Sequence, residues 1–191
     1  MLAFVTISKK NKYKYRVIIP FYDDKGEPYY FQAKATQPYQ MSNKYINSGV
    51  EDKKPVYNEP NVDGEGVVYI TEGLLDSLFV QNSVASTGTS LSIRRIKEIK
   101  KMFRKRVWVM DNDKSGYKTV NRLYNMGETC FIMPKKYDNI KDLNDLALLL
   151  KKDDLTEIIK ENSYNPLEGL IELSRRENGI HRKKQRFKQV Y

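Results

Sequence analysis

Cysteine and histidine are nearly absent from this sequence. The 191 residues include one cysteine, Cys130, and one histidine, His181, which lies inside a strongly basic stretch. A single cysteine cannot build a disulfide framework or a cysteine-based zinc site, and the position of the histidine argues against a histidine catalytic relay. The scarcity of cysteine fits a reducing, cytoplasm-like compartment.

Long apolar runs are also missing. No stretch of 18 apolar residues occurs, and the first ten residues, MLAFVTISKK, are too short for a signal peptide. We therefore expect no membrane association. With 40% hydrophobic residues the chain can bury a core, and its length suits one domain with at most a small additional lobe.

Acidic residues are scarce in two segments of the chain. The formal net charge is +10, but segment 92–106 contributes +7 and segment 174–191 contributes +6, so the remaining residues sum to about −3. A nearly neutral body with two basic segments favours a polyanionic partner such as nucleic acid. The alternative is that both segments are solvated faces that aid solubility.

Apolar periodicity divides the chain into a β-rich start and an α/β body. Residues 14–35 read as two strands joined by a turn at 24–26, and residues 36–66 read as loop and linker. From residue 67 onward strands and helices alternate, which predicts a parallel sheet with flanking helices. The expected strands are 67–71, 83–87, 106–110 and 128–134, and the expected helices are 72–82, 92–103, 114–127 and 142–152.

The last part of the chain reads as a helix followed by a basic tail. Asn165 and Pro166 form a helix-start signal, and Gly179 can end that helix. We therefore expect a small β-rich lobe at 1–60, an α/β domain at 61–164, and a C-terminal helix with a basic tail at 165–191.

Acidic residues follow several of the expected strands. Glu72 comes directly after the first strand of the α/β body, Asp111 and Asp113 follow the third, and Asp142 lies beyond the fourth. Functional groups of parallel sheets gather beyond the carboxyl ends of the strands, so these acids are predicted to converge. Asp76 is four residues after Glu72 and would share one face of the expected helix at 72–82.

The segment DNDKSG allows three interpretations. It resembles the first half of a calcium loop, with Asp111, Asp113 and Gly116 at positions 1, 3 and 6. Ser115 at position 5 is a weak ligand, however, and Arg122 stands at position 12, where the loop needs a glutamate, so we reject that interpretation. A capping turn and a magnesium site remain, and the other acids favour magnesium, which takes carboxylates together with water and phosphate.

The ordered motifs EGLLD, DNDKSG and KDLND resemble the Toprim domain, over about residues 66–150. That domain is shared by DnaG-type primases, topoisomerases and some nucleases. The preceding segment, RVIIPFYDDKGEPYYFQAKA followed by NKYINS, is similar to the stretch before Toprim in DnaG-type primases. One departure is that Asn144, two residues after Asp142, stands where many bacterial primases have a second aspartate.

The resemblance implies the catalytic core of a DNA primase that makes short RNA primers on single-stranded DNA from ribonucleoside triphosphates. It implies Mg²⁺ or Mn²⁺ as cofactor, with Glu72, Asp111 and Asp113 catalytic. The implied metal ligands are Asp76, Asp111, Asp113, Asp142 and Asn144. The residues implied to hold nucleotide or template are Arg16, Lys34, Lys44 and Tyr45.

The basic segments supply further candidates for nucleic-acid binding: Arg94, Arg95, Lys101, Arg104, Lys105, Arg182, Lys183 and Lys184. A replicative helicase and a separate zinc-binding module are expected partners in trans, since the sequence contains neither. Two alternatives stay open: a Toprim nuclease that uses the same acids, and a non-catalytic Toprim protein that binds nucleic acid as a recombination mediator.

Overall fold

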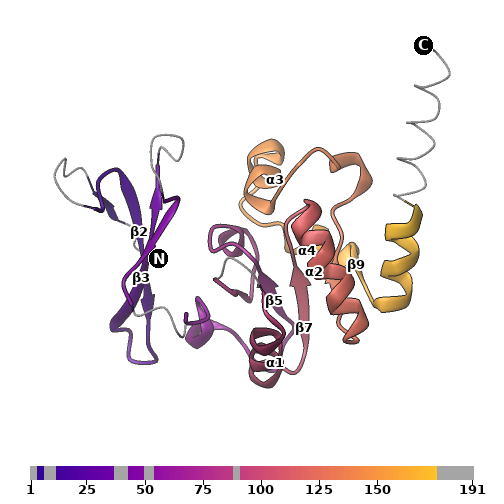
Figure 1. The fold of residues 1–191 in the computed structure, drawn as a ribbon, viewed down its shortest axis with the longest axis horizontal. Coiled ribbons are helices and arrows are strands. Elements are labelled where there is room, and N and C mark those ends of the chain that lie inside the picture. Colours follow the sequence, from indigo (N-terminus) through magenta and orange to yellow (C-terminus); the bar gives the residue numbers. More distant parts are fainter. Residues whose placement is uncertain (1–3, 7–11, 37–42, 50–53, 88–90, 176–191) are drawn as a thin grey trace, which may run out of the picture. The chain divides into compact units, whose positions relative to one another are not determined.

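The computed structural model describes residues 4–6, 12–36, 43–49, 54–87 and 91–175. The chain divides into two compact units, residues 1–61 and residues 62–191 (Figure 1). The second unit includes the helix that runs through 166–175, which the sequence analysis treats as part of a separate C-terminal segment.

The first unit is a four-stranded antiparallel sheet in the order β1-β2-β3-β4. Its strands are β1 (Phe4–Thr6), β2 (Arg16–Tyr22), β3 (Pro28–Ala35) and β4 (Tyr45–Asn47). The predicted hairpin at 14–35 is therefore confirmed. Its turn is fixed by the carboxylate of Asp23, which accepts hydrogen bonds from the N–H groups of Lys25 and Glu27, and by Gly26, whose φ is +80°.

The second unit is built on a five-stranded sheet in the order β6-β5-β7-β8-β9. Its strands are β5 (Val68–Thr71), β6 (Ser83–Ala85), β7 (Arg106–Val109), β8 (Cys130–Phe131) and β9 (Ser163–Tyr164). The first four strands are mutually parallel, and β9 is antiparallel to β8. The predicted α/β class, a parallel sheet with flanking helices, is confirmed (Figure 1).

The helices of the second unit connect and cover these strands. They are α1 (Ile93–Met102), α2 (Lys114–Asn125), α3 (Leu143–Leu150), α4 (Thr156–Glu161) and the helix through 166–175, with short 3₁₀ helices η3 (Asp76–Phe79) and η4 (Lys135–Tyr137). A further 3₁₀ turn, η2 (Glu59–Asn61), ends the first unit. Within the described ranges, no helix is both long enough and apolar enough to span a membrane.

Every residue of β5 is buried, as are the last three of β7, because each of these strands has neighbours on both sides and helices above and below. Helix α1 packs on the sheet through Ile96 and Ile99, which are fully buried, and Phe103 continues that face. Ile93, at the start of α1, is 53% exposed, so the buried face of this helix begins at Ile96.

The expected helix at 72–82 is wrong. Only the short η3 forms there, and Leu78 within it is 39% exposed. Local hydrogen bonds compete with the helix: the hydroxyl of Thr71 donates to the carbonyl of Gly73, and that of Ser77 donates to the carbonyl of Leu74. Glu72 and Asp76 therefore do not share a helix face.

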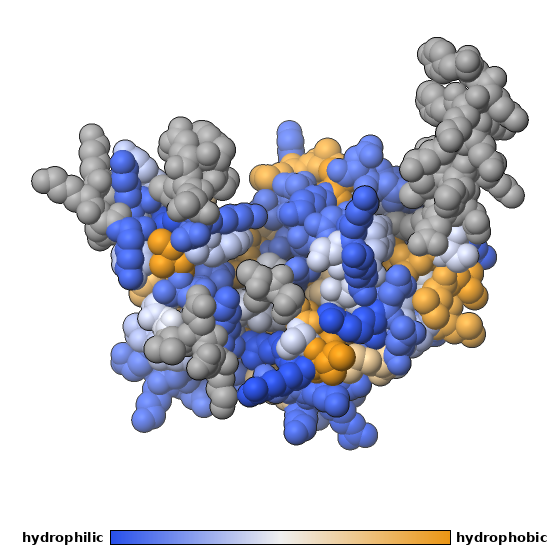
Figure 2. Space-filling view, viewed as in Figure 1, coloured by the Kyte–Doolittle hydropathy of each residue, from blue (hydrophilic) through white to orange (hydrophobic). Residues whose placement is uncertain are grey.

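The helix through 166–175 begins as the sequence predicts. The side chain of Asn165 accepts a hydrogen bond from the N–H of Glu168, which is an N-cap. The helix packs closely at Gly169, where an added Cβ would lie 2.1 Å from the ring of Tyr124. Its opposite side leaves Leu167 exposed. Figure 2 shows apolar surface in the region of this terminal helix.

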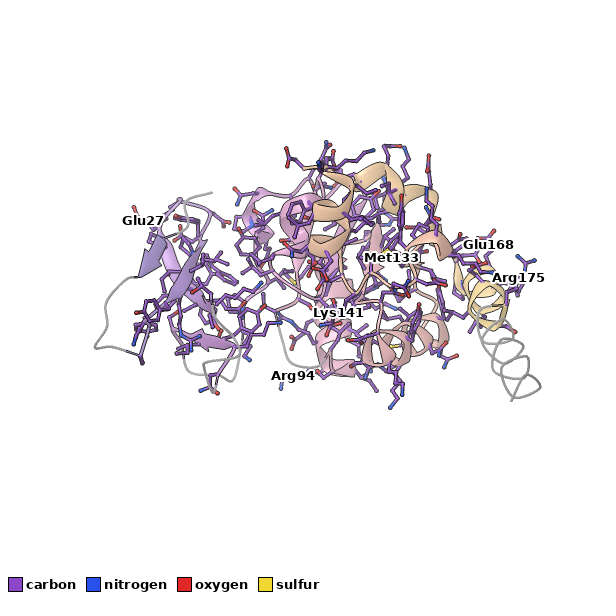
Figure 3. All side chains as sticks on the ribbon, turned by 90° about the horizontal axis from the view of Figure 1, so that it is seen from above. Glu27, Arg94, Met133, Lys141, Glu168 and Arg175 are labelled. Atoms are coloured by element: carbon purple, nitrogen blue, oxygen red, sulfur yellow. The ribbon has the colours of Figure 1, made fainter. Side chains whose placement is uncertain are left out.

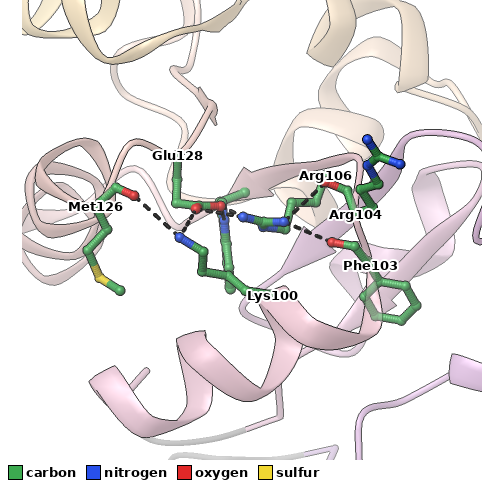
Figure 4. Close-up of polar contacts among 7 residues, drawn as sticks. Lys100, Phe103, Arg104, Arg106, Met126 and Glu128 are labelled. Carbon is green, nitrogen blue, oxygen red and sulfur yellow. Dashed lines mark hydrogen bonds and ion pairs between the residues drawn. The ribbon is translucent and has the colours of Figure 1, made fainter.

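A buried carboxylate joins α1, β7 and the start of β8 (Figure 4). Glu128 is 3% exposed and lies 2.6 Å from the ammonium of Lys100 and 2.6 Å from the guanidinium of Arg106, and the indole N–H of Trp108 donates to it at 2.8 Å. Burial alone would raise the pKa of Glu128, but these three donors outweigh burial and the pKa is lowered. Lys100 and Arg106, two cations of the basic segment 92–106, are thus paired with a buried carboxylate of the protein itself.

We predict that Glu128→Ala lowers the free energy of unfolding by about 3 kcal/mol, because it leaves two partly buried cations unpaired. The carboxylate stabilises the fold above its ordinary pKa and loses that effect as pH falls through the lower folded-state pKa, so the difference between wild type and variant shrinks below about pH 4. Urea unfolding at a series of pH values measures this.

The matched control is Glu98→Ala, which removes a glutamate that pairs with Arg94 and Arg95 on the exposed side of α1. It should change stability far less than Glu128→Ala does, because solvent screens exposed ion pairs. Equal effects of the two substitutions would contradict a structural role for the buried carboxylate.

Candidate active site

The ends of the two central strands bring carboxylates together. Glu72 follows β5 and Asp111 follows β7, and the N–H of Glu72 donates to the carbonyl of Val109 at 3.3 Å, which keeps the two strand ends level. The pKa of Glu72 is raised, first by burial and then by the charges of Asp111 and Asp113. These three acids therefore act on one another, as expected for side chains at one edge of the sheet.

Asp113 caps α2 and belongs to the acidic cluster as well. Its Oδ1 accepts hydrogen bonds from the N–H groups of Ser115 and Gly116, both at 2.9 Å. Gly116 is required there, because an added Cβ would lie 1.8 Å from the carbonyl oxygen of Asp111. The capping and metal-binding interpretations of DNDKSG are compatible, since the capping bonds are made by one of the two carboxylate oxygens.

Asp142 joins the cluster from the N-terminus of α3. It caps that helix by accepting the N–H of Asp145 at 2.9 Å, and its charge contributes to the raised pKa of Asp111. Burial has the largest effect on the pKa of Asp111 and raises it. The charge of Lys141 has the next largest effect and lowers it, without cancelling the rise. Four acids from three parts of the chain, Glu72, Asp111, Asp113 and Asp142, thus interact at one edge of the sheet.

Asp76 has a different position from the one predicted. It is 9% exposed, its Oδ1 accepts the N–H of Asn144 at 3.0 Å, and its Oδ2 lies over Gly73, where an added Cβ would be 2.2 Å away. Asp76 therefore holds α3 against the β5–η3 connection. This hydrogen bond is made by the backbone N–H of Asn144. Residue Asn144 is itself partly exposed, two positions after Asp142.

Two residues of this site were not assigned from the sequence. Asn112, the middle residue of the aspartate loop, donates its N–H to the carbonyl of Lys141 at 2.6 Å and its side-chain amide to the carbonyls of Asp138 and Ile140, and the Tyr117 hydroxyl donates to it. The ammonium of Lys141 lies 3.6 Å from Asp111 Oδ2. The only sequence signal for either residue was its place inside a quoted motif.

Lys141 lies near the middle of the second unit, far from the terminal helix that carries Glu168 and Arg175 (Figure 3). Partial burial lowers its pKa, but the charges of Asp111, Asp142 and Asp113 outweigh burial, and the pKa is raised. Lys141 is therefore protonated at neutral pH beside the carboxylates.

The acids fit a metal ion of the magnesium type. In the described residues, no three Asp, Glu, Cys or His side chains stand close enough together to enclose an ion. Magnesium does not require such a cage, because it binds one or two carboxylates and completes its shell with water and substrate phosphate. Glu72 and Asp111, both held where burial and neighbouring acids raise their pKa, form an open donor set of that kind.

Arg16, implied by the resemblance to hold nucleotide or template, has a structural role instead. Its side chain is buried and its guanidinium donates to the carbonyls of Lys12, Ala33, Asn43 and Lys44. A guanidinium whose donors are used by backbone carbonyls is not presented to a phosphate. We therefore remove Arg16 from the candidate set.

The other candidates of the first unit lie together on neighbouring strands. Lys34 on β3 is directly opposite Tyr45 on β4, and the ammonium of Lys44 is 5.6 Å from the centre of the Tyr45 ring. Tyr45 is 37% exposed. A cation and an accessible aromatic ring side by side suit the binding of a nucleotide.

The basic candidates on and after α1 differ in how they are held. Arg94 pairs with Glu98, Arg95 donates to the carbonyl of Ser86, and Lys105 donates to the carbonyl of Glu65. Lys101 and Arg104 are exposed. Arg182, Lys183 and Lys184 lie outside the described residues.

We predict that Glu72→Gln stabilises the metal-free protein at pH 7 by about 0.5–1 kcal/mol, because it removes one of several repelling charges. A carboxyl group with a raised folded-state pKa stabilises the fold below its ordinary pKa of 4.5 and loses that effect as pH rises through the folded-state value. The gain should therefore disappear at acid pH. Urea unfolding with a chelator present measures it.

The control is Glu161→Gln, at the exposed end of α4, which should change stability by less than about 0.5 kcal/mol. A Glu72→Gln variant that is less stable than wild type at pH 7 would show that the carboxylate supports the fold and is not under repulsion.

Comparison with known proteins agrees with this geometry. Residues 69–147 match the Toprim-like family, a range that contains β7, the four acids and all of β5 except its first residue. The chain is 31% identical over 169 residues to the DNA primase of Enterobacteria phage T4, covering 85% of this chain and 47% of that protein. It is 26% identical over 178 residues to the DNA primase of Lactococcus lactis, covering 85% of this chain and 28% of that protein.

Solved structures give the same fold. A DNA primase domain from Pseudomonas aeruginosa matches with a TM-score of 0.63 at 18% identity, covering 90% of this chain and 60% of that one. The RNA polymerase domain of Mycobacterium tuberculosis primase DnaG matches with a TM-score of 0.63 at 17% identity, covering 90% and 63%. The chain spans about half or less of the length of the curated relatives. It contains a Toprim-like region over residues 69–147 and has the fold seen in the structures of DnaG-type primase domains.

Proposed function

We propose that this chain is the catalytic core of a DNA primase, which synthesises short RNA primers on single-stranded DNA from ribonucleoside triphosphates. The observation that carries the proposal is the group of interacting acids at the carboxyl ends of β5 and β7, inside the Toprim-like region. A pure binding protein gains nothing from carboxylates that face a phosphate backbone, because like charges repel.

In the proposed reaction, a primer 3′-hydroxyl attacks the α-phosphate of a nucleoside triphosphate, and pyrophosphate leaves. A Mg²⁺ or Mn²⁺ ion at the acidic cluster would lower the pKa of that hydroxyl and neutralise charge on the phosphate. Asp111, Asp113 and Asp142 would hold metal, with one or two carboxylates to each ion and Asn144 in support. Glu72 would either bind metal or take the proton of the hydroxyl. We no longer assign this role to Asp76, which is 9% exposed and has one carboxylate oxygen on the N–H of Asn144 and the other over Gly73.

Residues outside the acidic cluster bind nucleotide and template in this proposal. Lys34 and Lys44 pair with phosphates of the nucleotide or template, and the exposed ring of Tyr45 lies against a base. Arg94, Arg95, Lys101, Arg104 and Lys105 bind the DNA backbone, together with Arg182, Lys183 and Lys184. Binding through these cations weakens steeply as salt concentration rises.

The proposed enzyme acts with other replication proteins. A replicative helicase and a zinc-binding module supplied in trans are its expected partners, and it works in the cytoplasm, that of the host if a phage encodes it. The proposed domain roles follow the sequence: residues 1–60 bind nucleotide or template, residues 61–164 carry the chemistry, and residues 165–191 bind nucleic acid or the helicase.

We predict that the protein, given single-stranded DNA, labelled ribonucleotides and Mg²⁺ or Mn²⁺, makes short RNA products. Asp111→Asn should reduce their yield by about 10²-fold or more, because the amide cannot supply the charge that holds the metal. The matched control is Asp153→Asn, which removes the same charge from an exposed position after α3 and should leave the yield within about twofold. Gel electrophoresis of the labelled products measures both.

Two outcomes would contradict the proposal. Shortening of the template without synthesis, lost in Asp111→Asn, would identify a nuclease. DNA binding without any product, even when a helicase and a zinc-binding module are added, would identify a non-catalytic binding protein.

A further inference from the structure

The acidic cluster contains a cation that the proposed mechanism does not use. Lys141 extends from the loop between η4 and α3, and its ammonium lies 3.6 Å from Asp111 Oδ2. It also interacts electrostatically with Glu72, Asp113 and Asp142. An ordinary surface ion pair joins one cation to one anion and contributes little. Lys141 faces four anions from three parts of the chain.

The backbone of Lys141 is fixed to the aspartate loop. Its carbonyl accepts the N–H of Asn112 at 2.6 Å, and the Asn112 side chain donates to the carbonyls of Asp138 and Ile140 in the same loop. The side chain of Asn112 is in turn held by the hydroxyl of Tyr117. The Cα atom of Lys141 is therefore held next to the aspartate loop, whatever the position of its ammonium group.

The end of the Lys141 side chain is not enclosed. The side chain is 52% exposed, whereas that of Asp111 is 23% exposed. The ammonium can therefore leave the carboxylates by rotation of its flexible stem, without unpacking any buried group. Lys141 thus has a backbone that is held in place and an ammonium group that can move away, which are the two properties that a cation replaceable by a metal ion needs.

We propose that Lys141 is a resident countercation: it holds a cation's place beside Asp111 in the metal-free protein and is displaced when a divalent metal ion binds. The role rests on the proposed function, since it presupposes that Asp111 binds metal. It has two consequences. Lys141 reduces the repulsion that Glu72, Asp111, Asp113 and Asp142 would otherwise exert on one another, and it competes with the metal, so the site is weaker for metal than its carboxylates alone would make it.

The test is Mn²⁺ binding to the intact chain, measured by electron paramagnetic resonance of free Mn²⁺ without nucleotide or DNA. Lys141→Met should lower the Kd for Mn²⁺ by about three- to tenfold, because the competing charge is gone. Lys141→Arg keeps the charge and should bind within about twofold of wild type. The matched control is Lys135→Met, which removes an exposed lysine from η4 and should also bind within about twofold.

A second readout is the unfolding of the same variants in the presence of a chelator. Lys141→Met should lower the midpoint of urea unfolding at pH 7, Lys141→Arg should restore it, and adding Glu72→Gln to Lys141→Met should recover it because one repelling charge is removed. A side chain that merely covers the surface would not respond to the charge of Glu72.

Three results would overturn the role of Lys141. They are an unchanged or higher Kd for Mn²⁺ in Lys141→Met, an equal effect of Lys135→Met, or an arginine variant that behaves like the methionine variant. Failure of the metal site that the proposed function requires looks different, because wild type and Lys141→Met would then both fail to bind Mn²⁺ while unfolding as predicted. Failure of primer synthesis alone would leave the Mn²⁺ result unchanged and would appear only in the product assay.

Discussion

Electrostatic repulsion among carboxylates is the constraint on which this structure depends. Glu72, Asp111, Asp113 and Asp142 meet at one edge of a parallel sheet, where burial and neighbouring charges raise the pKa of Glu72 and Asp111. Nothing in the packing of the sheet requires acids there. The fold tolerates them because backbone hydrogen bonds, which do not depend on the charges being neutralised, hold each loop in place.

The same side chains serve structure and chemistry for that reason. Asp113 begins α2 and Asp142 begins α3, so two of the acids satisfy N–H groups that a helix start would otherwise leave without partners. A helix N-terminus also favours negative charge. The opposite electrostatic solution occurs at Glu128, where one buried carboxylate is matched by two cations and an indole. The charge of Glu128 is balanced by residues of the protein, whereas the four-acid cluster keeps negative charge that a bound cation can balance.

The sequence predicted those parts of the fold and the site that local chemistry determines. The hairpin with Gly26 at its turn, α2 with Asp113 at its start, and the alternation of parallel strands with helices all follow from residue pattern. Residues 72–82 have a helical pattern too, but Asp76 bonds to a backbone N–H 68 positions away, which no local pattern contains. Helix α4 and strand β9 were missed because six and two residues are too short to show a period.

The candidate residues divide in the same way. The motifs indicated which acids meet, because acids that follow parallel strands share an edge of the sheet. They could not indicate that the guanidinium of Arg16 donates to four backbone carbonyls, since a sequence shows a charge and not its partners. Nor could they indicate that Lys141 lies against Asp111, which depends on the bond between Asn112 and the carbonyl of Lys141.

The most direct test of the central claim is a crystal structure of the chain soaked in Mn²⁺, with the ion located by its anomalous scattering. The account predicts an anomalous peak within coordination distance of Asp111 and at least one other acid of the cluster, with the ammonium of Lys141 moved away. Peaks confined to other parts of the surface, or Glu72 and Asp111 found on separate sides of the sheet, would contradict it.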